Sequence, residues 1–253
     1  MSRPLALVTG SWRRIGAAIA ARLAGDGYDV ALHAGHEAEP EPDLLAAMER
    51  ARAAHHLFVA DLDDPAAVAR LPERVTAHFG RPIDLLVNNA SRFQAITTAN
   101  ASPYGDLLAH IGVNVAAPFA LACAVARGAG EGGAAVVNIL DQRIAQPPRD
   151  QIAYTLSKQA LAEATRTLAV ALAPRVRVNG VAPGLTMPTP DYTPGQIDRL
   201  AQAMPLGRLP APEDVAEAVA YLARARAVTG GTIFVDGGAN LAGFERDFVH
   251  LMR

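Results

Sequence analysis

The stretch Val8-Thr9-Gly10-Ser11-Trp12-Arg13-Arg14-Ile15-Gly16 decides the fold, because it joins an apolar run to a helical pattern. Gly10 allows the tight turn that leaves a strand, and Gly16 allows the following helix to pack closely. The first turn of a helix offers unpaired N–H groups and a partial positive charge, which suit a pyrophosphate. Taken alone, the stretch fits an ordinary strand-to-helix turn equally well. The rest of the chain has to decide between these interpretations.

Short apolar runs recur along the whole chain and alternate with helical patterns. Several runs are rich in Val, Leu and Ile without polar alternation, which is typical of strands covered on both faces. Alternating strands and helices predict an α/β fold with a doubly wound parallel sheet. No linker interrupts the pattern, so we expect one domain over residues 1–253. The predicted strands are 5–9, 29–33, 55–60, 83–88, 134–140, 176–181 and 232–235.

Composition restricts the classes of function. The chain has 253 residues, 51% of them hydrophobic and 19% charged, which excludes disorder and a coiled coil. A net charge of -2 without a basic block argues against nucleic acid as a partner. Cys123 is the only cysteine, so a disulfide framework and a thiolate metal cluster are excluded. A reducing, cytoplasmic location is expected.

Targeting and metal-binding patterns are absent from the sequence. No signal-peptide pattern precedes the first apolar run. The longest apolar segment, 116–126, contains Pro118 and is shorter than the roughly 20 residues that a bilayer requires. We therefore expect a buried or interface helix there, and no membrane association. The seven histidines show no metal-site spacing, so we expect no catalytic metal.

Tyr154 and Lys158 lie four residues apart in a predicted helix over 151–171, so both project from one face. A free tyrosine has a pKa near 10, and an adjacent ammonium favours the phenolate, which suits proton transfer near neutral pH. The pair could also be an incidental helical pair. Because Lys158 is the only lysine in the chain, we favour the functional interpretation.

The ordered set of motifs resembles the short-chain dehydrogenase/reductase family from Pro4 to about Ala242. Each motif alone is weak, whereas the set is specific. The resemblance implies a Rossmann-type doubly wound fold, with a seven-stranded parallel sheet and helices on both faces. The motifs are Thr9-Gly10 with Gly16, Asn88-Asn89-Ala90, Asn114, Tyr154-x-x-x-Lys158, Pro183-Gly184 and Asp236-Gly237-Gly238.

The same resemblance implies a nicotinamide cofactor and hydride transfer coupled to proton transfer. Tyr154 would handle the proton, Lys158 would lower its pKa and hold the nicotinamide ribose, and Asn114 would support a water relay. The residues implied for cofactor binding are Gly10, Arg13, Arg14, Ile15, Gly16, His33, His36, Asp61, Leu62, Asn88, Ala90, Tyr154, Lys158, Pro183 and Gly184.

Two departures from the general family pattern point to one branch. Most of the family has a third glycine where this chain has Arg14, and a catalytic serine where it has Asp141. Both features, with Asn88-Asn-Ala-Ser-Arg-Phe93, resemble the pteridine reductases, including bacterial dihydropterin and dihydrofolate reductases. By that resemblance Phe93 would stack on a pterin, Ser91 would line the cleft, and Asp141 and Tyr154 would meet the substrate. Arg14 would approach both the pyrophosphate and the pterin.

Asp141 also carries a physical argument. An ionised carboxylate only accepts hydrogen bonds and would repel charge developing on a carbonyl oxygen, so plain ketone reduction is disfavoured. A 2-amino-4-oxo pterin offers N–H donors instead. The alternative is that Asp141 caps a neighbouring turn, in a carbonyl or 3-oxoacyl reductase. A cofactor-binding sensor without turnover is a third possibility, from a different class.

The end of the second predicted strand bears on the choice of nicotinamide. An acidic residue there normally binds the ribose 2′-hydroxyl of NAD, and here the end reads Leu32-His33-Ala34-Gly35-His36. With Arg13 and Arg14 nearby, NADPH is favoured over NADH, although Glu37 is close. His36 would replace the usual cation. Asp61 would contact adenine, or cap a helix instead.

Three segments outside the core pattern complete the expectations. Residues 183–195 contain four prolines and two glycines and predict a mobile lid over the ligand. The acidic segment 37–43 is expected to be a solvated surface. The tail from Phe244 to Arg253 has apolar residues at roughly helical spacing and suggests packing on a neighbouring subunit, in a homotetramer or homodimer. Packing on its own chain is the alternative.

Overall fold

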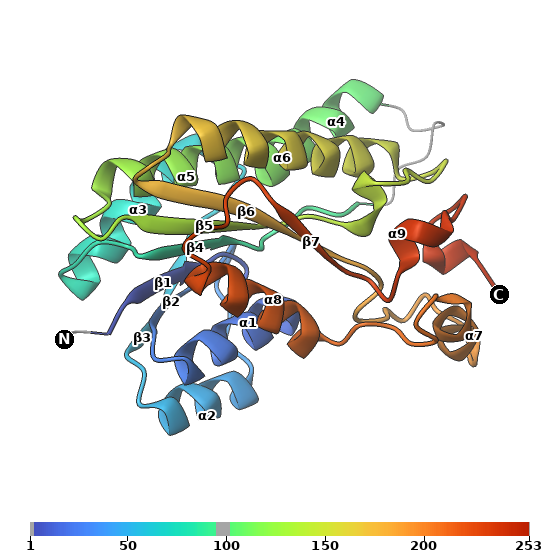
Figure 1. Cartoon of the computed structure of the whole chain (residues 1–253), viewed down its shortest axis with the longest axis horizontal. Coiled ribbons are helices and arrows are strands. Elements are labelled where there is room, and N and C mark those ends of the chain that lie inside the picture. The colour runs from blue at the N-terminus through green and yellow to red at the C-terminus, as the bar shows by residue number, and fades with distance from the viewer. Residues whose placement is uncertain (1–2, 95–101, 253) are drawn as a thin grey trace.

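The computed structural model of the chain describes residues 3–94 and 102–252, and its centre is a seven-stranded parallel sheet. The strand order is β3-β2-β1-β4-β5-β6-β7, and each neighbouring pair is parallel. The predicted Rossmann-type fold is thus confirmed (Figure 1). The strands are β1 (Leu5–Val8), β2 (Asp29–Ala34), β3 (His55–Val59), β4 (Leu85–Asn88), β5 (Ala134–Ile139), β6 (Val176–Pro183) and β7 (Thr232–Val235).

Two helical layers bury the sheet from opposite faces (Figure 1). In β1, Ala6 and Val8 pack into the core under one layer, and Leu5 and Leu7 pack into the core under the other. Burial on both faces explains why this strand is an unbroken apolar run. The layers are α1 (Arg14–Gly25), α2 (Pro42–Ala51) and α8 (Pro212–Arg224) on one face, and α3 (Pro65–Phe79), α5 (Ala117–Gly128) and α6 (Ile152–Ala171) on the other.

One helical run is longer than the sequence indicated. Helix α4 (Pro103–Ile111) continues through a π-turn, η1 (Gly112–Ala116), into α5, whose first turn contains Pro118. Among the described residues this run, Pro103–Gly128, is the one helix long and apolar enough to cross a membrane by length and composition. The apolar segment 116–126 is therefore only part of a longer helical run. One face of α5 is buried in the core at Leu121 and Val125.

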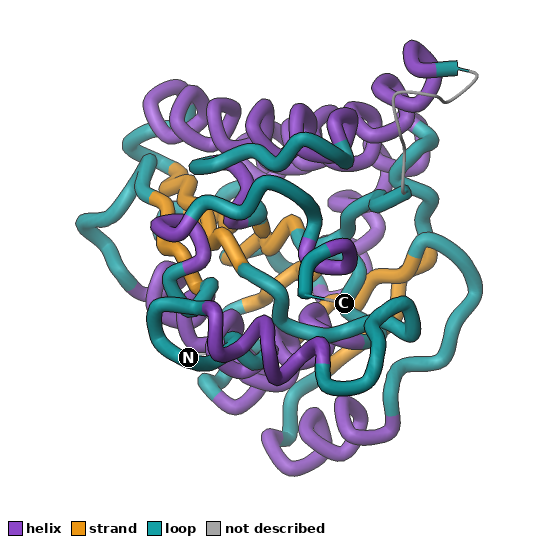
Figure 2. Tube along the Cα trace, turned by 90° about the vertical axis from the view of Figure 1, so that its right-hand side faces the viewer, coloured by secondary structure: helices purple, strands orange, loops and turns teal. Residues whose placement is uncertain are grey.

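The carboxyl ends of the strands carry the remaining short elements. Helices α7 (Gln196–Ala203) and α9 (Ala239–Ala242), with the 3₁₀ turns η2 (Gln142–Ile144) and η3 (Phe248–His250), follow or flank these ends. Figure 1 shows α7, α9 and the C-terminus at this edge, and Figure 2 turns it toward the viewer.

The C-terminal tail packs on its own chain. Phe248 is buried against Leu200 of α7, with Met204 and Ala239 in the same cluster. Phe248 is thus used within the chain, as the alternative of intrachain packing expects, while Met252 is 40% exposed and the contact with a neighbouring subunit stays a prediction. In this position the tail borders the functional edge of the sheet.

Candidate active site

Hydrogen bonds from the β4 end hold the glycine-rich turn after β1. The Thr9 hydroxyl oxygen accepts from the backbone N–H groups of Asn89 and Ala90, both at 3.0 Å. The Asn89 amide nitrogen donates to the carbonyls of Thr9 at 2.9 Å and Gly10 at 3.0 Å. A Cβ on Gly16 would lie 2.2 Å from the Gly10 carbonyl oxygen. The turn and the start of α1 therefore touch in a way that only glycine allows at Gly16.

His33 supports this turn from beneath. Its Nδ1 accepts from the Gly10 N–H at 3.0 Å, so the proton lies on Nε2, which donates to the Ala60 carbonyl at 2.9 Å. Burial lowers the pKa of His33 to about 4. The ring is neutral and both nitrogens are engaged, so His33 positions the turn and is no cation for a phosphate.

A groove of about 670 Å³ runs along the turn. Its lining brings together nine of the predicted cofactor residues, and also Ser91 and Phe93. The structure does not bring His36, Asn88, Pro183, Gly184, Tyr154 or Lys158 to its wall. The nine are Gly10, Arg13, Arg14, Ile15, Gly16, His33, Asp61, Leu62 and Ala90.

Several predicted cofactor residues have other surroundings. The Asn88 side chain is buried and donates to Asn138 Oδ1 at 2.8 Å, so it ties β4 to β5. His36 is exposed, with its Nδ1 2.9 Å from the Glu37 carbonyl. Pro183 ends β6 inside the core. Asp61 Oδ1 accepts from the Asp63 N–H at 2.9 Å, so its carboxylate organises the turn before α3.

The turn has the features that a dinucleotide requires. The Gly16 position leaves no room for a Cβ, Gly10 has φ +62 with a Cβ only 3.0 Å from the Ala90 Cα, and the α1 N-terminus opens onto the groove without a side-chain cap from Arg13. Such an end binds pyrophosphate through its N–H groups. One competitor is present, because Glu41 Oε1 accepts from the Arg14 N–H at 3.2 Å. The acidic segment 37–43 is therefore more than a solvated surface.

Arg14 links the groove to the segment predicted as a lid. Its backbone has φ +56, in the left-handed region, at the position where most of the family has glycine. Its Nη2 donates to the Met187 carbonyl at 3.3 Å. Arg14 is exposed and lines both the groove and the adjoining cavity.

Tyr154 and Asp141 are in direct contact. Asp141 follows the carboxyl end of β5, and Tyr154 lies in the first turn of α6. The Tyr154 hydroxyl donates to Asp141 Oδ2 at 3.1 Å. Asp141 Oδ1 accepts from the Arg143 backbone N–H and from its Nε, both at 3.0 Å. Asp141 thus caps the turn η2, as one interpretation expected, and also contacts Tyr154, while its role toward a substrate stays a prediction.

The pKa of Tyr154 is raised well above the usual value of 10, first by burial and then by the Asp141 carboxylate, while Arg143 acts to lower it. We expected the adjacent ammonium of Lys158 to favour the phenolate. In the structure two cations lie over the phenol ring, and Arg143 is the nearer, with its Cζ 4.9 Å and the Lys158 Nζ 5.7 Å from the ring centroid. Tyr154 is consequently a neutral phenol at neutral pH.

Lys158 lies below the site, with 2% of its surface exposed. Its Nζ donates to the Ile139 carbonyl at 2.8 Å. Burial lowers the pKa of Lys158 to about 8, although Asp141 acts to raise it. The pKa of Lys158 is therefore close to neutral pH, while its hydrogen bond fixes the Nζ at the end of β5.

Asn114 joins three segments behind Tyr154. Its Nδ2 donates to Ser157 Oγ at 2.9 Å and to the Arg92 carbonyl at 3.0 Å. Its Oδ1 accepts from the Arg92 N–H at 2.7 Å and from the Ser91 hydroxyl at 3.2 Å. Asn114 thus holds the Ser91-Arg92 segment against α6, and the water relay from Lys158 stays a prediction.

A cavity of about 510 Å³ opens beside Tyr154. Phe93 lies at its wall, 52% exposed, with its ring edge-to-face on Tyr154 at 4.8 Å between centroids. Arg14, Asp141 and Tyr154 line it as predicted, whereas Ser91 lines the groove. Segment 184–192 forms part of the wall, and the role of 183–195 as a mobile lid stays a prediction. The lining includes Gly184, Leu185, Thr186, Met187, Thr189, Asp191 and Tyr192.

The sequence interpretation missed Arg143 and the tail residues of this cavity. Asp247, Phe248, Val249 and His250 line it, and the Arg143 Nη2 donates to Asp247 Oδ2 at 3.0 Å. The only signal for Arg143 was its place two residues after Asp141. Asp247 had no signal, because it is 104 residues from its partner.

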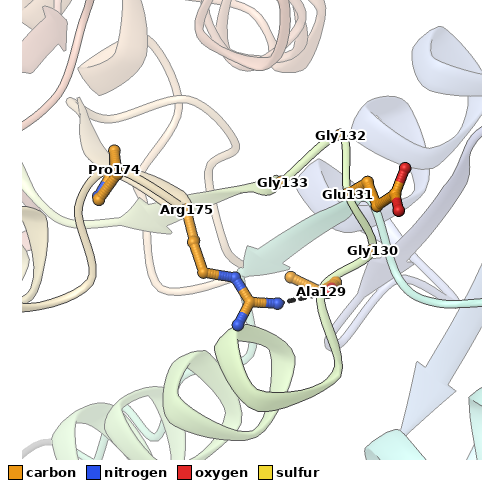
Figure 3. A pocket seen from close by; sticks show the side chains of 7 residues that line it. All are labelled: Ala129, Gly130, Glu131, Gly132, Gly133, Pro174 and Arg175. Carbon is orange, nitrogen blue, oxygen red and sulfur yellow. Dashed lines mark hydrogen bonds between the residues drawn. The ribbon is translucent and has the colours of Figure 1, made fainter.

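A further hollow, of about 630 Å³, lies at the amino ends of β5 and β6, and Figure 3 shows the residues that line it. It is formed by 129–133 and by Pro174 and Arg175, before β5 and β6. The Arg175 Nη2 donates to the Ala129 carbonyl at 2.7 Å. Ligands of open parallel sheets bind at the carboxyl ends of the strands, so we place the active site there. Within residues 3–94 and 102–252, no group of three or more His, Cys, Asp or Glu side chains could hold a metal ion.

A doubly wound sheet with a glycine turn after β1, and a Tyr-Lys helix at the carboxyl edge, defines a dinucleotide-binding oxidoreductase. The comparisons give the family. Residues 10–240 match a family model described as enoyl-(acyl carrier protein) reductase. A solved short-chain dehydrogenase/reductase from Serratia marcescens is 33% identical, with TM-score 0.84, over 94% of this chain and 98% of that one. The chain belongs to the short-chain dehydrogenase/reductase family.

Two other relatives agree with the resemblance to pteridine reductases, and a third is a ketoacyl reductase. FolM alternative dihydrofolate reductase 1 from Brucella canis, solved with NADP, is 37% identical with TM-score 0.84, over 95% of this chain and 96% of that one. Pteridine reductase 1 from Leishmania tarentolae is 32% identical over 94% of this chain and 96% of its own length. A putative ketoacyl reductase 2 of the granaticin polyketide synthase from Streptomyces violaceoruber is 38% identical, over 94% and 96%.

Proposed function

We propose that this chain is an NADPH-dependent reductase of a pterin-type substrate, which converts a dihydropterin or dihydrofolate to the tetrahydro form. The observation that carries the proposal is the Asp141 carboxylate, held between Tyr154 and Arg143 at the wall of the cavity. A carboxylate only accepts hydrogen bonds, and the 2-amino-4-oxo edge of a pterin presents N–H donors. The exposed ring of Phe93 offers a stacking surface at the same cavity.

The groove would hold the dinucleotide, with its pyrophosphate at the α1 N-terminus and Lys158 at the nicotinamide ribose. When bound, NADPH supplies the hydride. The end of β2 carries no carboxylate, and Arg13 is exposed at the groove, where it suits a 2′-phosphate. The Brucella canis structure contains NADP, which supports the same choice. His36 stays a candidate for the same phosphate, because its ring lies 5.7 Å from Trp12, whose ring is under Arg13.

Tyr154 would deliver the proton. Reduction of a C=N bond requires a proton on nitrogen, and a phenol with a raised pKa is protonated at neutral pH, the state that a donor needs. Lys158 would support Tyr154 from below, and Asn114 would support the relay that returns the proton. Asp141 would orient the substrate through its N–H groups.

The second candidate is a carbonyl or 3-oxoacyl reductase on a non-pterin substrate. The 38% identity to the granaticin ketoacyl reductase supports it as strongly as the pteridine reductase supports the first. Oxidation of NADPH with dihydrobiopterin, dihydrofolate and a panel of ketones and 3-oxoacyl thioesters distinguishes them. Activity on ketones alone would reject the pterin assignment. Cofactor binding without consumption of any substrate would favour the sensor.

Two variants test the roles of the site. Tyr154→Phe removes the proton donor and should abolish most turnover, while NADPH binding, followed by nicotinamide fluorescence, is retained. Unchanged turnover would reject the donor role. Asp141→Ser restores the side chain common in the family, and should lower kcat/KM for dihydropterin more than for any ketone. Equal losses on both classes of substrate would remove Asp141 from substrate selection.

We also infer that the protein is a cytoplasmic homo-oligomer, a homotetramer or a homodimer, with a small molecule as its substrate. Its outer helical layer carries exposed apolar side chains, Phe119 at 50% and Leu156 at 45%. Such residues on neighbouring helices are typical of a contact between subunits.

A further inference from the structure

Arg143 organises the Asp141 carboxylate. Its backbone N–H and its Nε both donate to Asp141 Oδ1, which leaves Oδ2 for the Tyr154 hydroxyl. One oxygen of the carboxylate is thus fixed by Arg143, and the other faces the phenol. The orientation of Asp141 toward Tyr154 therefore depends on the position of the Arg143 guanidinium.

The guanidinium itself is held by a second carboxylate, on the C-terminal tail. The Arg143 side chain is 7% exposed and its Nη2 donates to Asp247 Oδ2 at 3.0 Å. Its Nη1 is buried without a hydrogen-bond partner among the described residues. This cation is therefore held by two carboxylates, those of Asp141 and Asp247, and by the face of the Tyr154 ring. Removing one partner of a buried charge is strongly destabilising.

Asp247 is fixed in turn by the rest of the chain. Its N–H donates to Asp150 Oδ1 at 2.8 Å, in the segment that leads into α6. The Gln196 Nε2 of α7 donates to three tail carbonyls, at 3.2 Å for Phe248, 3.2 Å for Val249 and 2.6 Å for Leu251. The tail cannot leave this position without breaking a contact that reaches the catalytic pair.

We propose that Arg143 is a positioning residue for the pair of Tyr154 and Asp141, and that Asp247 of the C-terminal tail holds Arg143 where it acts. The tail is thus part of the active site of its own chain. The inference rests on the role of Tyr154 and is independent of which substrate is reduced.

The test is a double-mutant cycle on the full-length protein, with Arg143→Gln, Asp247→Asn and both together. We expect each single variant to lower kcat about tenfold or more, because a small misplacement of reacting groups has that effect. The NADPH dissociation constant, measured by nicotinamide fluorescence, should change little, because Arg143 and Asp247 line the substrate cavity and not the dinucleotide groove. The double variant should be no slower than Arg143→Gln alone. Arg143→Lys keeps the charge without the fork and should recover part of the loss.

Glu245→Gln is the matched control. It removes the same charge two residues before Asp247, from a carboxylate paired at the surface with Arg149, where the side chains are 73% and 78% exposed. Its kinetics should be those of the wild type. Wild-type kcat in Asp247→Asn, or independent and multiplicative effects in the double variant, would overturn the proposal. A parallel loss of NADPH affinity and kcat would also overturn the proposal, because it would indicate a general defect of the fold.

A readout without substrate separates this proposal from the proposed function. The Cζ resonance of ¹³C-labelled Tyr154, assigned with Tyr154→Phe, reports the hydrogen bond to Asp141. We expect it to move in Arg143→Gln and Asp247→Asn and to stay in place in Glu245→Gln. An unmoved resonance in Arg143→Gln refutes the positioning role, even if every substrate assay succeeds. A moved resonance in a protein that reduces no pterin refutes only the substrate assignment.

Discussion

Arg14 shows how a single residue combines a backbone and a side-chain role. Its φ of +56 is unfavourable for any residue with a Cβ, and its guanidinium reaches the carbonyl of Met187. Replacement by glycine relieves the backbone, whereas replacement by alanine removes the same side chain without that relief. We expect Arg14→Gly to be about 1 kcal/mol more stable than Arg14→Ala in urea unfolding. Higher stability of the alanine variant, as helix propensity alone would give, would contradict the strained backbone.

His33 predicts how stability depends on pH. Its pKa falls from 6.5 in the unfolded chain to about 4 in the folded protein, so the unfolded state binds more protons between these values. Stability from this group is full above pH 6.5 and is lost as the pH falls toward 4. Between pH 7 and pH 5 we expect a loss of about 2 kcal/mol, seen by urea unfolding at each pH.

His33→Gln should lose less stability over this pH interval than the wild type, and His36→Gln, which changes an exposed ring nearby, should follow the wild type. Equal pH dependence of the wild type and His33→Gln would show that other groups cause the loss.

Single residues could be assigned from the sequence where the motif fixes the neighbours. Tyr154 and Asp141 were predicted to share the site, and they form a hydrogen bond. Arg143 and Asp247 could not be paired, because nothing local places the tail against η2. His33 lines the groove as predicted, but the sequence could not show that both of its ring nitrogens are hydrogen-bonded to the backbone, because a motif does not reveal such partners.

At the scale of elements, the start of α1 depends on one close approach. A methyl group at Gly16 would meet the Gly10 carbonyl, Asn89 and Ser11, whereas a methyl group at Gly25 in the same helix meets nothing within 4 Å. Gly16→Ala should destabilise the protein by about 1–3 kcal/mol and weaken NADPH binding, because overpacking moves the phosphate turn. Gly25→Ala should be neutral or up to about 1 kcal/mol more stable. Thermal unfolding and fluorescence titration measure both; comparable effects of the two substitutions would disprove the close approach.

Most elements were predictable because their patterns are local. The predicted helix over 151–171 corresponds to α6, and the apolar runs correspond to the seven strands. The full run Pro103–Gly128 was not predicted, because only its apolar part at 116–126 was recognised from the sequence. The π-turn at Gly112–Ala116 precedes Pro118, which has no N–H to donate to the carbonyl of Asn114.

At the scale of the whole molecule, the strand order places the site. The order reverses between β1 and β4, so the loops after these strands separate and leave the groove between them. The alternation of strands and helices predicted such a sheet. It could not show that the last residues of the chain would return to the carboxyl edge and close the cavity, because that depends on contacts far apart in the sequence.

The proposed oligomer makes a prediction at the same scale. Phe119→Asp or Leu156→Asp places a charge on the exposed apolar layer of α5 and α6, and should reduce the assembled mass measured by light scattering. Ala69→Asp adds the same charge to an exposed position of α3 and should leave the mass unchanged. A wild-type protein that is monomeric at micromolar concentration would refute the assembly.

The burial of Lys158 has a practical consequence for chemical labelling. It is the only lysine of the chain and is 2% exposed, so a folded molecule offers an acylating reagent no accessible ε-amine. Succinimidyl esters should then modify the α-amino terminus first. Acylation of Lys158, detected by mass spectrometry, would occur only in molecules in which α6 has separated from β5. Its rate would therefore measure how often the catalytic centre opens.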